Sequence, residues 1–234
     1  MEGGDISMLS SMFYKLWANG LIQMGIWETV YMTMIASFFS YLFGLPLGVI
    51  LTVTDKNGIC ENRAVNSILG FAVNFFRSIP FIILMVAMLP VAKFVVGTSL
   101  GNKAVIVMLI IGASPYVARM VESSIKEVDA GVIEAAQAMG ANKLQIICKV
   151  LLPEAKPSLI IGAAISIVTI LSYSAMAATL GGTGLGQIAI IYGHQRNNSD
   201  ITWICVFLTV IIVQIIQMAG TAIAQKTDKR IRNK

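Results

Sequence analysis

Five apolar runs, each long enough for a helix to cross a lipid bilayer, constrain this chain more than any other feature of its sequence. A helix rises about 1.5 Å per residue, so ~20 apolar residues cross a hydrocarbon core of about 30 Å. Only 12% of the residues are charged, about half the share usual in soluble domains. The runs therefore predict an all-α polytopic membrane protein with five transmembrane helices. They lie at residues 29–53, 66–89, 104–121, 158–178 and 201–224.

The second run is irregular because it contains Arg77 and Pro80. An arginine in the middle of a membrane is costly unless it is paired or reaches water. In one interpretation the helix spans 66–89 and Arg77 faces the bundle interior near the break made by Pro80. In the other, the span starts at Ser78 and Arg77 lies at the cytoplasmic interface. The guanidinium either satisfies the Phe76 carbonyl that Pro80 leaves free, or binds a substrate carboxylate.

Positive charge gathers on one side of the predicted spans. With Arg77 set aside, one side holds 12 of the lysines and arginines and the other holds 4. Because loops rich in Lys and Arg stay in the cytoplasm, the N-terminus is predicted outside and the C-terminus in the cytoplasm. The net charge of +5 is explained by this topology, so no nucleic-acid partner is expected.

The runs divide the chain into three parts. Residues 1–26 are expected to form a segment on the outer side, either a poorly packed end or a short helix on the membrane surface. Residues 27–224 form the transmembrane domain, with a cytoplasmic loop at 122–157. Residues 225–234 form a basic cytoplasmic tail. The candidate surface helix would present Met8, Met12, Leu16 and Trp17, and Trp27 also suits the interface.

The cytoplasmic loop carries helix signals on both sides of a glycine. Asp129 is placed to cap a helix that runs to about residue 139. Gly140 follows at the helix end, where a left-handed residue is often needed. Asn142 and Gln145 have the spacing of a capping box, so a second helix begins at once. The pattern predicts two short helices that meet at a glycine elbow.

The second short helix is expected to be amphipathic. Leu144, Ile147 and Leu151 fall on one face at helical spacing. Pro153 is expected to end or bend the helix. Such an elbow suits a groove on a partner protein.

The spacing of the loop residues resembles the EAA loop of ABC importer permeases. That family shows Glu-Ala-Ala, a glycine six residues after the glutamate, and an aliphatic-x-Leu-Pro ending. The resemblance implies that residues 134–153 couple this chain to a separate ATPase. The residues assigned to coupling are Glu134, Ala135, Ala136, Gly140, Leu144, Val150, Leu152 and Pro153.

Little in the sequence suits catalysis, so no enzyme, cofactor or metal site is expected. His194 is the chain's one histidine and lies in a predicted outer loop. The glycine-rich stretch at 181–186 lacks the lysine of a nucleotide-binding loop and is expected to form a tight turn. Cys60, Cys148 and Cys205 show no pairing pattern and are expected as free thiols.

The fourth run contains a polar cluster that is a candidate solute path. Hydroxyl groups within a span either bond back to their own helix or line a path for a small polar solute. Both interpretations stay open for each residue. The candidates are Ser172, Tyr173, Ser174 and Met176, with Arg77 from the second run.

Further motifs make nearly the whole chain, from Trp27 to Gly220, resemble the methionine ABC importer permease. They are Phe76-Arg77-Ser78-Ile79-Pro80-Phe81, Ala118-Arg119-Met120-Val121-Glu122, Leu152-Pro153-Glu154-Ala155, Tyr173-Ser174-Ala175-Met176 and Gly184-Leu185-Gly186-Gln187. The resemblance implies a type I importer fold in the bacterial inner membrane and a homodimer whose two copies enclose the path. It also implies two cytoplasmic ATPase subunits, an external substrate-binding lipoprotein, and methionine or a similar amino acid as the solute.

Two alternatives remain. The first is an importer permease for another amino acid or small polar solute. The second is a membrane scaffold that docks a cytoplasmic partner through the same loop. A quaternary-amine importer is disfavoured because the sequence shows no aromatic box for a cation.

Overall fold

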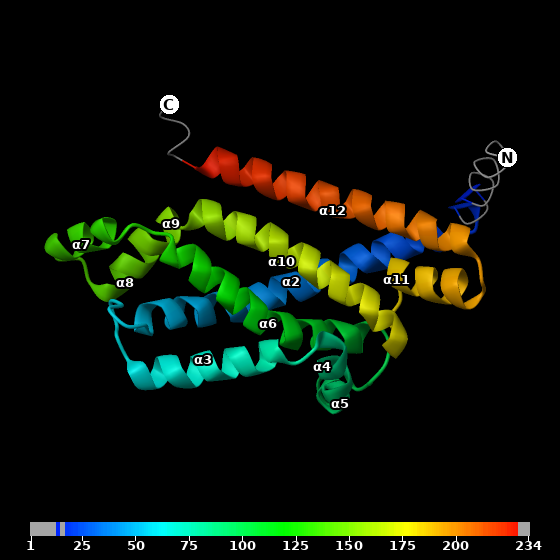
Figure 1. Cartoon of the computed structure of the whole chain (residues 1–234), viewed down its shortest axis with the longest axis horizontal. Coiled ribbons are helices and arrows are strands. Elements are labelled where there is room, and N and C mark those ends of the chain that lie inside the picture. The colour runs from blue at the N-terminus through cyan, green and yellow to red at the C-terminus, as the bar shows by residue number, and fades with distance from the viewer. Residues whose placement is uncertain (1–12, 15–16, 229–234) are drawn as a thin grey trace. The chain divides into compact units, whose positions relative to one another are not determined.

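The apolar runs fold into helices because, in hydrocarbon, every backbone amide and carbonyl must find its partner within the protein. The computed structural model describes residues 13–14 and 17–228, and every element assigned within them is helical. In chain order (Figure 1) they are α2 (Leu21–Thr54), α3 (Arg63–Ser78), α4 (Phe81–Ala87), α5 (Leu89–Val96), α6 (Asn102–Lys126), α7 (Ala130–Ala138), α8 (Lys143–Ile146), η1 (Ile147–Leu151), α9 (Leu152–Glu154), α10 (Lys156–Met176), η2 (Ala177–Leu180), α11 (Leu185–Gln187), η3 (Ile188–Gln195) and α12 (Ser199–Thr227).

Within the described residues, four helices are long and apolar enough to cross a membrane, namely α2, α6, α10 with η2, and α12. The number rises to five if α3 and α4 form one broken span. The prediction of an all-α membrane fold is therefore confirmed for the described part of the chain. The sides of the membrane on which the two ends lie remain a prediction.

The second run is broken at Ile79 and Pro80. Ile79 has an extended backbone, with φ −82° and ψ 125°, as expected of a residue that precedes proline. Its amide donates a 3.4 Å hydrogen bond to the Phe76 carbonyl, which Pro80 cannot satisfy. This backbone bond takes the place that the sequence offered to the Arg77 guanidinium, and the Arg77 side chain is exposed near the end of α3.

The chain divides into two compact units, and all four long helices contribute residues to both. The first unit takes its described residues from 1–37, 81–110 and 168–215. The second takes them from 38–80, 111–167 and 216–234. Each unit is described by itself below.

The first unit contains the glycine-rich turn, which is fixed by side-chain bonds. Asn102 Oδ1 accepts a 2.9 Å bond from the Thr183 amide, and Thr29 Oγ1 accepts one of 2.9 Å from the Leu185 amide. Leu185 belongs to a small buried core. The expected tight turn is present, with Gly181 and Gly184 at positive φ, but the sequence missed the helical residues that follow it. The core residues are Leu185, Ile188, Ile201 and Cys205.

The second unit is built on a close crossing of α2 and α6. A Cβ added to Gly44 would lie 2.7 Å from Val117 Cγ1, and one on Gly48 would lie 2.5 Å from the Ala118 carbonyl oxygen. Real Cβ atoms do not approach other atoms so closely, so the crossing requires glycine. The sequence predicted either a kink or a close crossing here, and the close crossing is what forms.

Two other expectations meet the structure differently. Between the runs at 66–89 and 104–121, where no helix was predicted, the chain forms α5, whose first turn carries Pro90 and whose end is capped by the left-handed Gly97. Of the proposed surface helix, Met8, Met12 and Leu16 lie outside the described residues, whereas Trp17 and Trp27 are exposed. Residues 229–234 of the basic tail also lie outside them. The cysteines are free, as expected.

Candidate functional site

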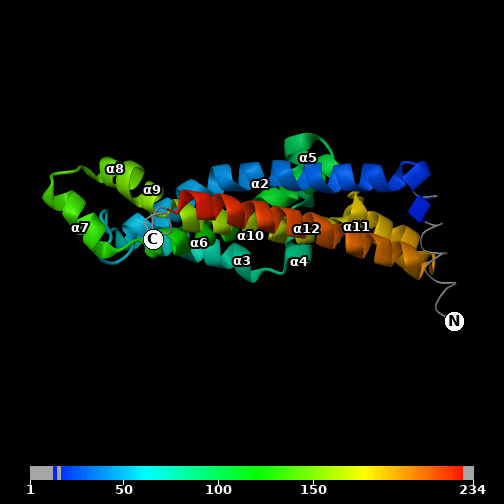
Figure 2. The same cartoon turned by 90° about the horizontal axis from the view of Figure 1, so that it is seen from above.

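The glycine elbow within residues 122–157 forms as the sequence predicts (Figure 1, Figure 2). Asp129 caps α7, its Oδ1 accepting a 2.7 Å bond from the Gly131 amide. Gly140 has φ +75°, and its amide donates to the Gln137 carbonyl at 2.9 Å. The left-handed glycine turns the chain so that it can start α8 within three residues.

The second helix begins with a complete capping box. Asn142 Oδ1 accepts from the Gln145 amide at 2.8 Å, and Gln145 Oε1 accepts from the Asn142 amide at 2.9 Å. Two backbone donors that a helix start leaves free are thus satisfied reciprocally. Both predicted caps of the loop are confirmed.

The apolar face of the second helix differs from the predicted one. The Leu144 side chain is 72% exposed, whereas Ile146 and Leu151 are 2% and 3% exposed. The cause is the π-helix η1, in which the Leu152 amide donates to the Ile147 carbonyl, five residues back. Each π-turn takes one more residue than an α-turn, so positions five apart share a face. The α-helical spacing correctly placed Leu151 in the buried face and Ile147, half-buried, against it, but it was wrong on Leu144.

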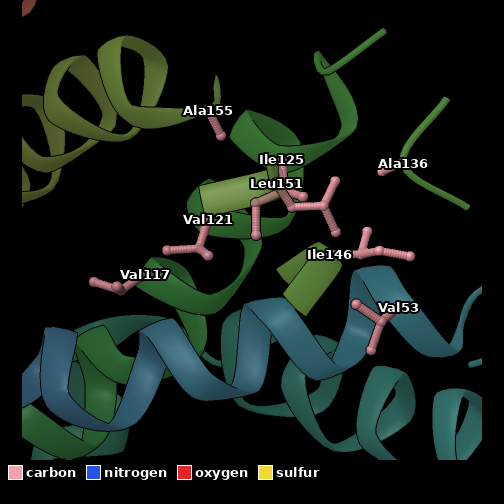
Figure 3. Close-up of a cluster of buried hydrophobic side chains, with 8 residues drawn as sticks. All are labelled: Val53, Val117, Val121, Ile125, Ala136, Ile146, Leu151 and Ala155. Atoms are coloured by element: carbon pink, nitrogen blue, oxygen red, sulfur yellow. The ribbon is translucent and has the colours of Figure 1, made fainter. Parts of the chain in front are cut away.

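The buried face fastens the loop to the ends of two long helices. Ala136 from α7, Ile146 from α8 and Leu151 from η1 pack in one cluster (Figure 3). The cluster unites residues of α2 and α6 with the loop and with the residue that precedes α10. Its buried members are Val53, Val117, Val121, Ile125, Ala136, Ile146, Leu151 and Ala155. Force applied to the loop therefore reaches α2 and α6 through close-packed side chains.

The residues assigned to coupling fall into two groups, those that pack in or against the buried cluster and those that are exposed. Ala136 is buried in the cluster, and Val150 and Leu152 are half-buried against it. The remaining ones are exposed, namely Glu134, Ala135, Gly140, Leu144 and Pro153. Met139 was not singled out by the sequence, yet its side chain is 81% exposed beside the elbow. The bend of the loop thus presents apolar side chains to the outside.

A cleft of about 330 Å³ lies beside the elbow. It opens between α7 and the turn that follows α2, and Glu134 and Gln137 line it from the α7 side. Across it lie Asp55 and Lys126, which form a 2.7 Å ion pair. The Lys126 ammonium, helped by the Lys56 backbone amide, holds the pKa of the Asp55 carboxyl below its ordinary value. Asp55 therefore keeps its charge at neutral pH and gives it up only in acid.

The candidate path residues of the first unit do not share one environment. Ser174 is buried and donates to the Leu171 carbonyl at 2.7 Å, so it is bonded to its own helix. Ser172 also bonds to its own helix, donating to the Val168 carbonyl at 3.1 Å, but it is exposed, as is Met176 one turn further along. Tyr173 stacks on Phe81 with ring centroids 4.1 Å apart, a partner that the sequence did not assign. The face of α10 that carries Ser172 and Met176 is the one still available to a solute.

Comparison with known proteins identifies the family of this chain. A family model described as "Binding-protein-dependent transport system inner membrane component" matches residues 44–233. The chain belongs to this family. The permease is thus a membrane component of a transport system and not an enzyme, as the sequence predicted.

Individual relatives match nearly the full length of the permease. A probable D-methionine transport system permease protein of Vibrio cholerae is 50% identical over 212 residues, which are 91% of this chain and 94% of the relative. A methionine import system permease protein of Bacillus subtilis is 45% identical over 204 residues, 87% and 92% of the two chains. A solved structure of the MetNI methionine ABC transporter in inward-facing conformations matches with a TM-score of 0.88 and 45% identity, over 89% and 97% of the chains.

We predict that the fold of the elbow depends on a left-handed backbone at Gly140. Val at this position would hold a β-branched side chain at positive φ, at a cost of about 1–3 kcal/mol, although open space surrounds the site. Hydrogen exchange of residues 130–155 should rise in Gly140→Val. Asn tolerates this backbone better, so Gly140→Asn should exchange nearly as the unchanged protein does. Equal protection in the Val variant would show that the elbow does not depend on a left-handed residue.

Proposed function

We propose that this chain is the transmembrane permease subunit of an ATP-driven importer of methionine. Two copies would enclose the path, two copies of a separate ATPase would bind in the cytoplasm, and an external binding protein would deliver the solute. The observation that carries the solute assignment is the 50% identity to the Vibrio cholerae permease over 91% of this chain.

The topology proposed for this importer places the loop of residues 122–157 and the C-terminal tail in the cytoplasm. The distribution of lysine and arginine supports this orientation. The loop then lies on the side of the membrane where ATP is available. Residues 27–224 would form the transmembrane domain, with the N-terminal segment outside.

The docking surface for the ATPase is proposed at the bend of the elbow. Met139 and Leu144 are 81% and 72% exposed, and they flank Gly140 on a part of the chain that lies outside the apolar runs. Exposed apolar side chains rimmed by polar ones are typical of a protein interface. Glu134 stands at the neighbouring cleft, where it would face a polar or basic group of the ATPase.

Transport then follows from movement of the elbow. When ATP closes the ATPase dimer, the elbows of the two permease copies are drawn together. The buried side of each elbow, with Ala136, Ile146 and Leu151 in the shared cluster, carries the displacement into α2 and α6. The spans swing to open the path outward and receive solute. The residues proposed for the solute path are Arg77 and, on the exposed face of α10, Ser172 and Met176, with Tyr173 at the edge of that face. Ser174 is buried and bonded to its own helix, so its proposed role is to hold that part of α10 in place.

Uptake of labelled methionine into liposomes tests the function. The permease is reconstituted with its ATPase and its binding protein, and uptake is followed with and without ATP. We expect uptake only when all three proteins and ATP are present, and competition by unlabelled methionine. If a different amino acid competes and unlabelled methionine does not, that amino acid is the solute and the methionine assignment is wrong. Uptake without nucleotide would contradict the ATP-driven mechanism. Binding of the ATPase with no uptake of any amino acid would favour the scaffold.

Two leucines of the loop separate docking from folding. Leu144→Ala removes an exposed side chain, so we expect ATPase binding to weaken about 5- to 30-fold, as at an interface hot spot, with the thermal midpoint unchanged. Leu151→Ala empties a site that is 3% exposed and should cost about 2–5 kcal/mol of stability. Pull-down of the ATPase and thermal unfolding in detergent distinguish the two. Normal ATPase binding by Leu144→Ala would show that the bend of the elbow is not part of the ATPase interface.

A further inference from the structure

A chain of polar contacts runs through the second unit and joins α2, α6 and α3. Asp55, just after α2, pairs with Lys126 at 2.7 Å. Lys126 also pairs with Glu122 at 2.9 Å. Glu122 accepts from Arg119 Nη1, and Arg119 Nη2 donates to Asn74 Oδ1 on α3 at 2.9 Å. In the sequence, Arg119 and Glu122 were noted only within one of the motifs shared with the methionine ABC importer permease.

Arg119 and Glu122, at the centre of this series of polar contacts, hold each other in a fixed orientation. The Glu122 side chain is 9% exposed, and both of its carboxylate oxygens accept hydrogen bonds, Oε2 from Arg119 and Oε1 from Lys126. The Arg119 guanidinium is planar and presents its donors in a fixed fork. With Nη1 committed to Glu122, its Nη2 is aimed at α3, where it also approaches the Gly70 carbonyl at 3.4 Å. Glu122 thus sets the direction in which Arg119 points.

Apolar packing ties α3 to the unit only lightly. α3 buries Val73, which packs with Leu51 of α2 and Ala118 of α6. Leu69 packs half-buried against this cluster, whereas Ile68 and Phe71 are 69% and 73% exposed. The contacts of Arg119 therefore make up a large part of the connection between α6 and α3. The same segment of α6 carries Val117, Val121 and Ile125, which pack in the coupling-loop cluster.

We propose that Arg119, oriented by Glu122 and Lys126, is the positioning residue that passes the displacement of the coupling loop on to α3. This inference rests on the proposed function. The loop moves α6 through the apolar cluster, and Arg119 makes α3 follow through Asn74. Arg77 lies three residues beyond Asn74, about one helical turn further along α3, so the displacement reaches the residue proposed for the solute path.

Asn74→Ala tests the inference without removing any of the paired charges. Asn74 is exposed, and its removal leaves Arg119, Glu122 and Lys126 paired. In liposomes with ATPase and binding protein, methionine uptake and ATP hydrolysis are measured together. We expect uptake per ATP to fall about tenfold, the loss expected of a hydrogen bond to a charged group. ATPase binding and the hydrolysis rate should stay within about twofold of the unchanged protein.

Asn66→Ala is the matched control. Asn66 lies on the same helix, but its Nδ2 donates to the Leu51 carbonyl of α2 at 2.7 Å. This variant therefore loosens α3 from α2 and leaves the link from α6 intact, so uptake per ATP should be retained. An equal loss in Asn66→Ala would show that any loosening of α3 uncouples transport, and would overturn the role of Arg119.

A double-mutant cycle completes the test. If Arg119 acts through Asn74, Arg119→Gln combined with Asn74→Ala should lower uptake per ATP no more than Arg119→Gln alone. Additive losses, or full coupling in Asn74→Ala, would overturn the inference and leave the proposed function standing. Failure of the unchanged complex to import methionine with ATP would instead overturn the proposed function, and this inference with it.

Discussion

The packing of the loop at residues 122–157 onto α2 and α6 is the interaction on which the rest of the second unit depends. A short helical elbow cannot hold its shape alone, because a helix of a few residues is unstable in water. Ala136, Ile146 and Leu151 give it that shape by burial against Val53, Val121 and Ile125. Because the buried face is used in this way, Met139 and Leu144 are left on the outside. One set of side chains fixes the loop to the membrane domain, and the opposite set is available to a partner.

Helix α6 carries both kinds of connection that a transmitting element needs. Its apolar side chains, including Val117 and Val121, receive the loop, and its Arg119 reaches α3. The two connections differ in their physics. Apolar packing resists compression but has no preferred direction, whereas the forked guanidinium bonds only to acceptors placed in its plane. An apolar contact on the loop side and a directional polar contact on the α3 side would let one helix convert a push into a defined displacement.

Local chemistry made much of this predictable. The Asp129 cap, the left-handed Gly140 and the Asn142–Gln145 box each depend on residues within a few positions of one another, and the long helices follow from the apolar runs. Contacts between distant residues were not predictable. The π-helix that exchanges Leu144 for Ile146 on the buried face shifts the register in a way that α-helical spacing cannot anticipate. The bond from Arg119 to Asn74 joins residues 45 positions apart. The helix from Ile188 to Gln195 follows a glycine-rich turn and was therefore expected as a loop.

Thiol labelling tests most directly whether residues 134–153 form a cytoplasmic surface to which the ATPase binds. Cys148 lies in this stretch and is exposed, whereas Cys205 is buried. In a Cys60→Ser background, a membrane-impermeant maleimide therefore reports on Cys148. We expect labelling of Cys148 in inside-out vesicles, none in intact spheroplasts, and protection when the ATPase is bound. Labelling of Cys148 from the outside of intact spheroplasts would show that the loop does not face the cytoplasm.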